Sequence, residues 1–88
     1  MNVVFRKRFL KEFSKIPKGE RSKIEVSIFE QLPEAKSLFE LGNVAHMKGY
    51  SSYYKARFGQ YRIGLKMEND REILERALHR KDIYRFFP

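Results

Sequence analysis

The chain has 88 residues, of which 19 are Lys or Arg and 11 are Asp or Glu, so its formal net charge at pH 7 is +8. A chain of this length has room for one hydrophobic core, which predicts a single domain over residues 1–88 and excludes two-domain enzymes. It has no Cys, which excludes disulfides and thiolate metal sites, and no apolar run long enough for a signal peptide or a membrane span, so we expect a soluble cytoplasmic protein.

The N-terminal third of the chain predicts one strand and two helices. Residues 2–5 contain Val-Val-Phe, whose β-branched and aromatic side chains favour a short strand. Apolar residues then recur every three or four positions, which predicts an amphipathic helix that ends at Pro17. Its apolar positions are Phe5, Phe9, Phe13 and Ile16. The same spacing at Ile24, Ile28 and Leu32 predicts a second helix up to Pro33, packed on the first as an antiparallel hairpin.

The middle of the chain changes from a helical period to a strand period. Residues 34–53 show only a possible helical turn within 35–41 and a short edge strand near 44–48. From Tyr54 onward, apolar and basic residues alternate on both sides of Gly59-Gln60. This predicts a β-hairpin with a type II′ turn, which a Gly-X pair suits. We expect the apolar positions to face the helices, and these are Tyr54, Ala56, Phe58, Tyr61, Ile63, Leu65 and Met67.

The C-terminal third contains one ambiguous element. Asn69-Asp70 predicts a turn, after which the composition of residues 71–79 favours a helix, whereas their place after a hairpin strand favours a third strand. The pattern alone does not decide, and we take the strand. We expect a final turn or short helix, attached to the sheet by Ile83 and by Phe86 or Phe87. The predicted fold class is α+β: β-α-α followed by an antiparallel β-meander, with the helical hairpin packed on one face of a twisted sheet.

The predicted hairpin places four cations on its other face, namely Lys55, Arg57, Arg62 and Lys66. Arg57 and Arg62 lie close to opposite each other, where like charges destabilise strand pairing. Such a cost indicates an anionic ligand, and the spacing of the side chains suits the phosphates of one RNA or DNA strand. Net charge alone leaves nucleic acid, an acidic protein and an anionic membrane surface as partners, and a merely solvated basic face remains the alternative.

The sequence also restricts the chemistry. It contains no glycine-rich phosphate loop, no dinucleotide fingerprint, no serine-hydrolase elbow and no zinc-protease motif. His46 and His79 lie far apart in the sequence and there is no Cys, so we expect no metal and no cofactor. Lys, Arg, Tyr and His can still cleave RNA without a metal. A base takes the proton of a ribose 2′-OH, Arg stabilises the phosphate charge, and an acid protonates the leaving 5′-oxygen.

Two segments resemble motifs of the RelE/ParE superfamily of bacterial toxins from type II toxin–antitoxin pairs. Residues 54–63, YKARFGQYRI, are similar to the family's hairpin, and residues 79–85, HRKDIYR, to its closing segment. The likeness spans nearly the whole chain and implies the same β-α-α and β-meander fold. It further implies one of two functions: the RelE branch cuts messenger RNA in the ribosomal A site, whereas the ParE branch poisons DNA gyrase and is not a nuclease.

The resemblance also implies a catalytic set. Lys55 or Arg57 would act as the base and bind phosphate, and Arg62 would stabilise the transition-state phosphate. Arg80 would aid leaving-group protonation or charge neutralisation, and Tyr84 would orient the nucleotide. Lys55 is the better base because Arg is effectively never neutral.

The identity of the base nevertheless stays open among Lys55, His79 and Tyr84, since some branches of the family use a C-terminal His. Around the catalytic set we expect further residues that bind RNA or phosphate. These are Lys48, Lys66, His79, Lys81 and Arg85.

The leading hypothesis is therefore the toxin of a type II pair, a metal-independent endoribonuclease (mRNA interferase) that needs the ribosome and inhibits translation. The alternative is a ParE-like gyrase inhibitor without nuclease activity. The resemblance implies an acidic cognate antitoxin as a partner, besides ribosome and messenger RNA. It implies operator DNA only through the antitoxin complex, and no membrane. Apolar residues left on the helical hairpin or the sheet edge are the expected groove for the antitoxin.

Overall fold

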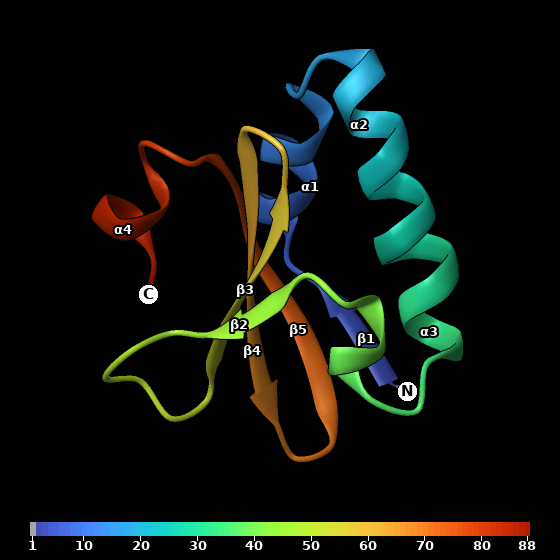
Figure 1. The fold of residues 1–88 in the computed structure, drawn as a ribbon, viewed down its shortest axis with the longest axis vertical. Coiled ribbons are helices and arrows are strands. Elements are labelled where there is room, and N and C mark those ends of the chain that lie inside the picture. The colour runs from blue at the N-terminus through green and yellow to red at the C-terminus, as the bar shows by residue number, and fades with distance from the viewer. Residues whose placement is uncertain (1) are drawn as a thin grey trace.

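The computed structural model describes residues 2–88, which form a five-stranded sheet with helices on both sides (Figure 1). The strands are β1 (Asn2–Phe5), β2 (Val44–His46), β3 (Tyr53–Phe58), β4 (Tyr61–Glu68) and β5 (Arg71–His79). Their order in the sheet is β1-β5-β4-β3-β2, and all neighbours are antiparallel except β1 and β5. The predicted α+β class and the meander are confirmed.

The helices account for most of the remaining chain. They are α1 (Lys7–Ser14), α2 (Lys18–Glu25), the π-helix η1 (Val26–Gln31), α3 (Leu32–Glu34), the 3-10 helix η2 (Leu38–Leu41) and α4 (Ile83–Phe86). In Figure 1, α2, η1 and α3 form one continuous rod along one side of the sheet, whereas α4 lies on the opposite side. The rod extends one residue beyond Pro33, where the sequence predicted its end. The wider π-helical turn just before Pro33 provides a local change of geometry, which a proline ring requires inside a helix.

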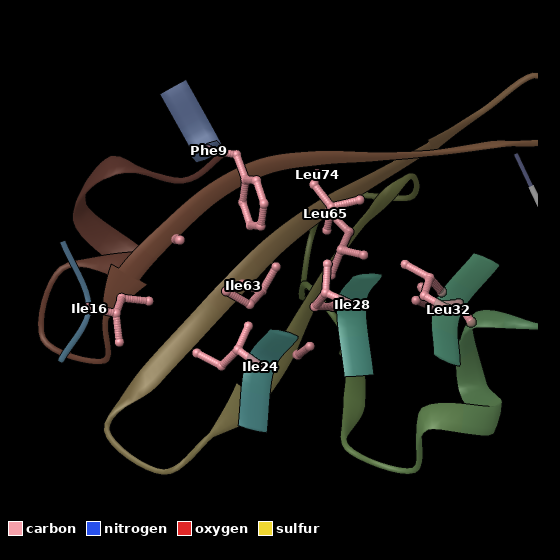
Figure 2. Packing of buried hydrophobic residues seen from close by; sticks show 11 residues of the cluster. Phe9, Ile16, Ile24, Ile28, Leu32, Ile63, Leu65 and Leu74 are labelled. Atoms are coloured by element: carbon pink, nitrogen blue, oxygen red, sulfur yellow. The ribbon is translucent and has the colours of Figure 1, made fainter. Parts of the chain in front are cut away.

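The main core lies between the rod and the sheet. Figure 2 shows Ile63 reaching toward Ile24, and Leu65 and Leu74 toward Ile28. The predicted inward face of the hairpin is confirmed for Ala56, Ile63 and Leu65, which are buried, and for Tyr54, Phe58 and Tyr61, which pack partly buried against them. Met67 is the exception, because its side chain remains 36% exposed. It stands near the end of β4, next to the point where the rod itself ends.

The two predicted turns have the backbone geometry that hairpins require. Gly59 has φ +58° and Gln60 is not in the left-handed region, as in the predicted type II′ turn. Asn69 and Asp70 both have positive φ, so the second hairpin also turns tightly. Residues 71–79 form a strand, because β5 pairs with β1 on one side and β4 on the other, and this pairing overrides their helix-favouring composition.

A second, smaller core attaches the C-terminus to the other face of the sheet. Ile83 and Phe87 are buried there with Met47, whereas Phe86 is half exposed, so Phe87 is the anchor of the two predicted candidates. Gly64 makes this contact possible. A Cβ built at Gly64 would lie 2.8 Å from the Phe87 ring, so only glycine lets the ring lie directly on β4.

Candidate functional site

An open cleft of about 840 Å³ lies on the face of the sheet opposite the helical rod. Its lining residues are Gly42, Asn43, Val44, Ala45, Lys55, Arg57, Arg62, Arg80, Lys81 and Tyr84. The strand alternation that buries Ala56 and Ile63 turns the basic side chains of β3 and β4 to this side. The C-terminal segment supplies the remaining cations, so the fold gathers five positive charges and no carboxylate from distant parts of the chain.

Arg57 and Arg62 form the centre of the cleft. They are paired residues of β3 and β4, as predicted, and no described carboxylate forms an ion pair with either. The Arg62 Nη1 donates hydrogen bonds to the carbonyl oxygens of Gly59 (2.7 Å) and Tyr61 (2.9 Å), which hold its guanidinium at the turn. Burial lowers the pKa of Arg62, and the charges of Arg57 and Arg80 lower it further. Arg62 stays charged at neutral pH, and a bound anion would relieve this crowding.

Tyr84 closes the cleft from α4. Its ring is 67% exposed, and the Lys55 Nζ lies over the ring, 4.3 Å from its centroid. This cation–π contact fixes the ammonium group and the aromatic face side by side. Arg80 is fixed in turn, because its backbone N–H donates to the carbonyl oxygen of Gln60 in the hairpin turn (2.7 Å).

The loop before β2 forms a wall of the cleft that the sequence did not indicate. Asn43 exchanges two hydrogen bonds with the backbone of Arg57: its carbonyl oxygen accepts from the Arg57 N–H (2.9 Å), and its Nδ2 donates to the Arg57 carbonyl oxygen (2.7 Å). Gly42, with φ +80°, ends η2 just before it. The only sequence signal was this Gly-Asn pair next to a predicted edge strand.

Six of the predicted site residues therefore meet in the cleft, namely Lys55, Arg57, Arg62, Arg80, Lys81 and Tyr84. Two of the others lie outside it with partners of their own. Lys66 pairs with Glu68 (3.1 Å), which raises the pKa of Lys66 and lowers that of Glu68. Arg85 extends over the ring of Phe86, 5.4 Å from its centroid.

The remaining two predicted residues are also outside the cleft. His79 packs edge-on against Tyr61, and its Nδ1 accepts a hydrogen bond from the Lys81 N–H (3.2 Å). Together with Glu12 it lines a separate small cavity beside α1. Lys48 is exposed in the loop between β2 and β3.

Two further properties describe residues 2–88 as a whole. Within this part of the chain, no three His, Cys, Asp or Glu side chains are grouped so that they could hold a metal ion. None of the helices described above is long and apolar enough to cross a membrane.

Comparisons with known proteins find toxins of one kind. The chain is 40% identical over 89 residues to Toxin RelE3 of Methanocaldococcus jannaschii, and the match covers all of both chains. A chain in the crystal structure of the RelB-RelE antitoxin-toxin complex from Methanococcus jannaschii is 38% identical, with a TM-score of 0.81 over 97% of this chain and 99% of that one. A chain in the toxin-antitoxin complex RelBE2 from Mycobacterium tuberculosis shares the fold, with 18% identity, a TM-score of 0.67, and 90% and 96% coverage. No family model matches the chain.

Proposed function

The chain belongs to the RelE family of toxins from toxin–antitoxin systems, and on this basis we propose that it is a ribosome-dependent endoribonuclease. It cleaves messenger RNA in the ribosomal A site and so inhibits translation in the cytoplasm. The observation that carries the proposal is the cleft, in which five cations and Tyr84 converge and no carboxylate is present. The gyrase-inhibitor alternative is not favoured, because the relatives found are RelE toxins.

In this mechanism, Arg57 and Arg62 bind the scissile phosphate. The phosphate gains negative charge when the ribose 2′-oxygen adds to it, so a donor already in place stabilises the transition state more than the ground state. Two carbonyl oxygens already hold the Arg62 guanidinium through one of its nitrogens, and its other N–H groups remain to donate to the phosphate. The absence of ion pairs at Arg57 and Arg62 among the described residues supports this role.

Lys55, Arg80 and Tyr84 serve the proton transfers and the orientation of the nucleotide. In its neutral amine form, Lys55 takes the proton of the 2′-OH and becomes an ammonium, while the 2′-oxygen bonds to phosphorus and the bond from phosphorus to the 5′-oxygen breaks. Arg80 neutralises the charge on the departing 5′-oxygen until that oxygen takes a proton from a water molecule. The products are a 2′,3′-cyclic phosphate and a 5′-hydroxyl. A nucleobase stacked on the exposed ring of Tyr84 keeps its ribose close to Lys55, whose Nζ lies 4.3 Å from the ring centroid.

The partner of the toxin is a cognate antitoxin, as in the complexes of its structural neighbours. We propose that this antitoxin is acidic, since the toxin carries a charge of +8. Exposed apolar side chains on the helical side offer it further contacts, and these are Leu10, Val26 and Phe39. Operator DNA is bound only through the antitoxin complex.

The decisive experiment is primer extension on messenger RNA held in the A site of purified ribosomes. We expect cuts with the wild-type protein, none without ribosomes, and a loss of more than a hundredfold in rate with Arg62→Ala. Lys23→Ala is the matched control, because Lys23 is an exposed cation on α2, away from the cleft. An intact message with wild-type protein, together with inhibition of gyrase supercoiling, would overturn the proposal.

A further inference from the structure

A second cavity, of about 660 Å³, lies where α3 ends and β4 turns into β5. Its lining residues are Pro33, Glu34, Ala35, Lys36, Ser37, Met67, Asp70 and Glu72. Three of these are carboxylates and one is a cation, so the cavity is acidic in a protein with a charge of +8. It is far along β4 from the basic cleft, since Arg62 stands near the start of that strand and Met67 near its end.

Glu72 is the unusual group in this cavity. Its residue is only 1% exposed, and neither carboxylate oxygen has a hydrogen-bond partner. A buried carboxyl without a partner is costly and rare in folded proteins, because water no longer solvates it and nothing replaces the water. Burial also raises the pKa of Glu72 to about 7. The fold therefore maintains at this site an acceptor that a donor from outside could satisfy.

The walls of the cavity indicate which kind of donor fits. Ser37 begins a capping box: its Oγ accepts from the Phe39 N–H, and the Glu40 carboxylate accepts from the Ser37 N–H (3.0 Å), so this wall is fixed before any ligand arrives. Ala35 and the exposed Met67 add apolar surface beside the acidic groups. A charged head with an aliphatic stem matches such a mixture of surfaces.

We propose that this cavity binds an alkylammonium or guanidinium group, with the Glu72 carboxylate as its counter-ion. The flexible side chain of Met67, which neighbours Glu72 across β4 and β5, moves aside to admit the cation. A metal ion is not the ligand, because residues 2–88 offer no suitable group of three metal-binding side chains. The proposal does not rest on RNA cleavage, and no reagent in its test involves RNA or the ribosome.

Binding is expected to depend on pH, because the cation pairs with the ionised form of Glu72. The other charged groups lining the cavity are Glu34 at the end of the rod, Lys36 just after it and Asp70 in the turn, and all three are exposed. The strand neighbours Val3 and Met67 carry no charge. Affinity should therefore rise about tenfold between pH 6 and pH 8, as a group with a pKa near 7 ionises.

The test is nuclear magnetic resonance of the full chain with ¹³C-labelled Glu carboxyls. Through-bond correlations in the uniformly ¹³C- and ¹⁵N-labelled wild-type protein assign the Glu72 resonance, and its titration midpoint is measured with and without agmatine or putrescine. We expect either probe, at about ten times its dissociation constant at pH 8, to lower the midpoint by about one pH unit, and the same salt concentration as KCl to leave it unchanged. A midpoint that no probe moves would overturn the proposal, and this measurement on the wild-type protein does not depend on the folding of any variant.

Two further arms sharpen the result. Glu72→Gln should remove the probe-dependent shifts of the Met67 and Ser37 amides, and Glu30→Gln, which alters an exposed carboxylate on η1, should keep them. Equal binding by Glu72→Gln and the wild type would contradict the proposal. A blocked peptide with a single Arg distinguishes the sources: tighter binding than agmatine assigns the site to a side chain of a partner protein, and weaker binding assigns it to a free amine.

Discussion

At one end of β4 and β5, Arg62 and Arg80 belong to a group of cations that lies open to solvent. At the other end, Glu72 carries a carboxyl that is buried without a partner. In water the repulsion between like charges is screened and costs little, whereas burial keeps a carboxyl neutral. The arginines of the exposed cluster are therefore permanently charged and ready for an anion. The buried group becomes charged only as the pH rises through 7 or a cation arrives.

The largest expected effect is on RNA cleavage, through the arginines of the basic cleft. Arg62→Ala removes a donor that is held in place before the substrate binds, and should cost about 3 to 4 kcal/mol of transition-state stabilisation. Arg80→Ala should have a similar effect, with the folded state unchanged by circular dichroism. Cleavage rates on ribosome-bound messenger RNA measure both. If either folded variant cuts at the wild-type rate, that arginine has no part in the chemistry.

The next largest effect is on the stability of the protein, and it follows from the raised pKa of Glu72. Because the pKa in the folded state is raised to about 7, the folded protein holds a proton that the unfolded chain has lost between about pH 4.5 and pH 7. The free energy of unfolding is therefore highest below about pH 4.5, where Glu72 is protonated in both states. It falls by roughly 2 to 3 kcal/mol as the pH rises through 7. Urea unfolding of the wild type and Glu72→Gln at pH 5 and pH 8 measures it. Glu72→Gln should lack this loss, and parallel pH profiles for the two proteins would refute the assignment.

A third effect lies between the two ends, at Gly64. Gly64→Ala should displace the Phe87 ring, because the new Cβ would lie 2.8 Å from it, and destabilise the protein by about 2 kcal/mol. Cleavage should fall as well, since Phe87 and Ile83 hold the helix that carries Tyr84. Gly19→Ala is the matched control: no atom lies within 4 Å of its added Cβ, and alanine favours α2. Equal stability of the two variants would show that the Phe87 ring adjusts without cost.

The sequence predicted the basic cleft better than the surroundings of Glu72, for physical reasons. Alternation along the hairpin placed Lys55, Arg57 and Arg62 on one face, because strand periodicity is a local property. It could not show that Glu72 would be buried, since that depends on residues 33–37 lying beside the start of β5, nor that Gly64 would lie under the Phe87 ring. Both are contacts between segments far apart in the chain.

His79 shows the same limit within the site. The resemblance suggested a place for His79 in the site, since some branches of the family use a C-terminal His. The strand that contains it alternates, and the His79 ring lies against Tyr61, while Arg80 and Tyr84 line the cleft. The sequence did not predict the position of the loop at Asn43, because the loop has no periodic pattern.

The smallest expected effect is on stability, through the repulsion between the like charges of the basic cleft. Arg57→Gln removes the like charge opposite Arg62 and should stabilise the protein by about 0.5 kcal/mol in low salt, while weakening RNA binding. Lys66→Gln is the control, because Lys66 belongs to the same hairpin but is paired with Glu68, so its loss should not stabilise. Urea unfolding at low and high ionic strength separates the two cases, since salt screens exposed charges and should shrink the gain at Arg57. A gain that persists in high salt would mean that side-chain packing or strand propensity, and not charge repulsion, is responsible, and the comparison between the two ends would lose its electrostatic basis.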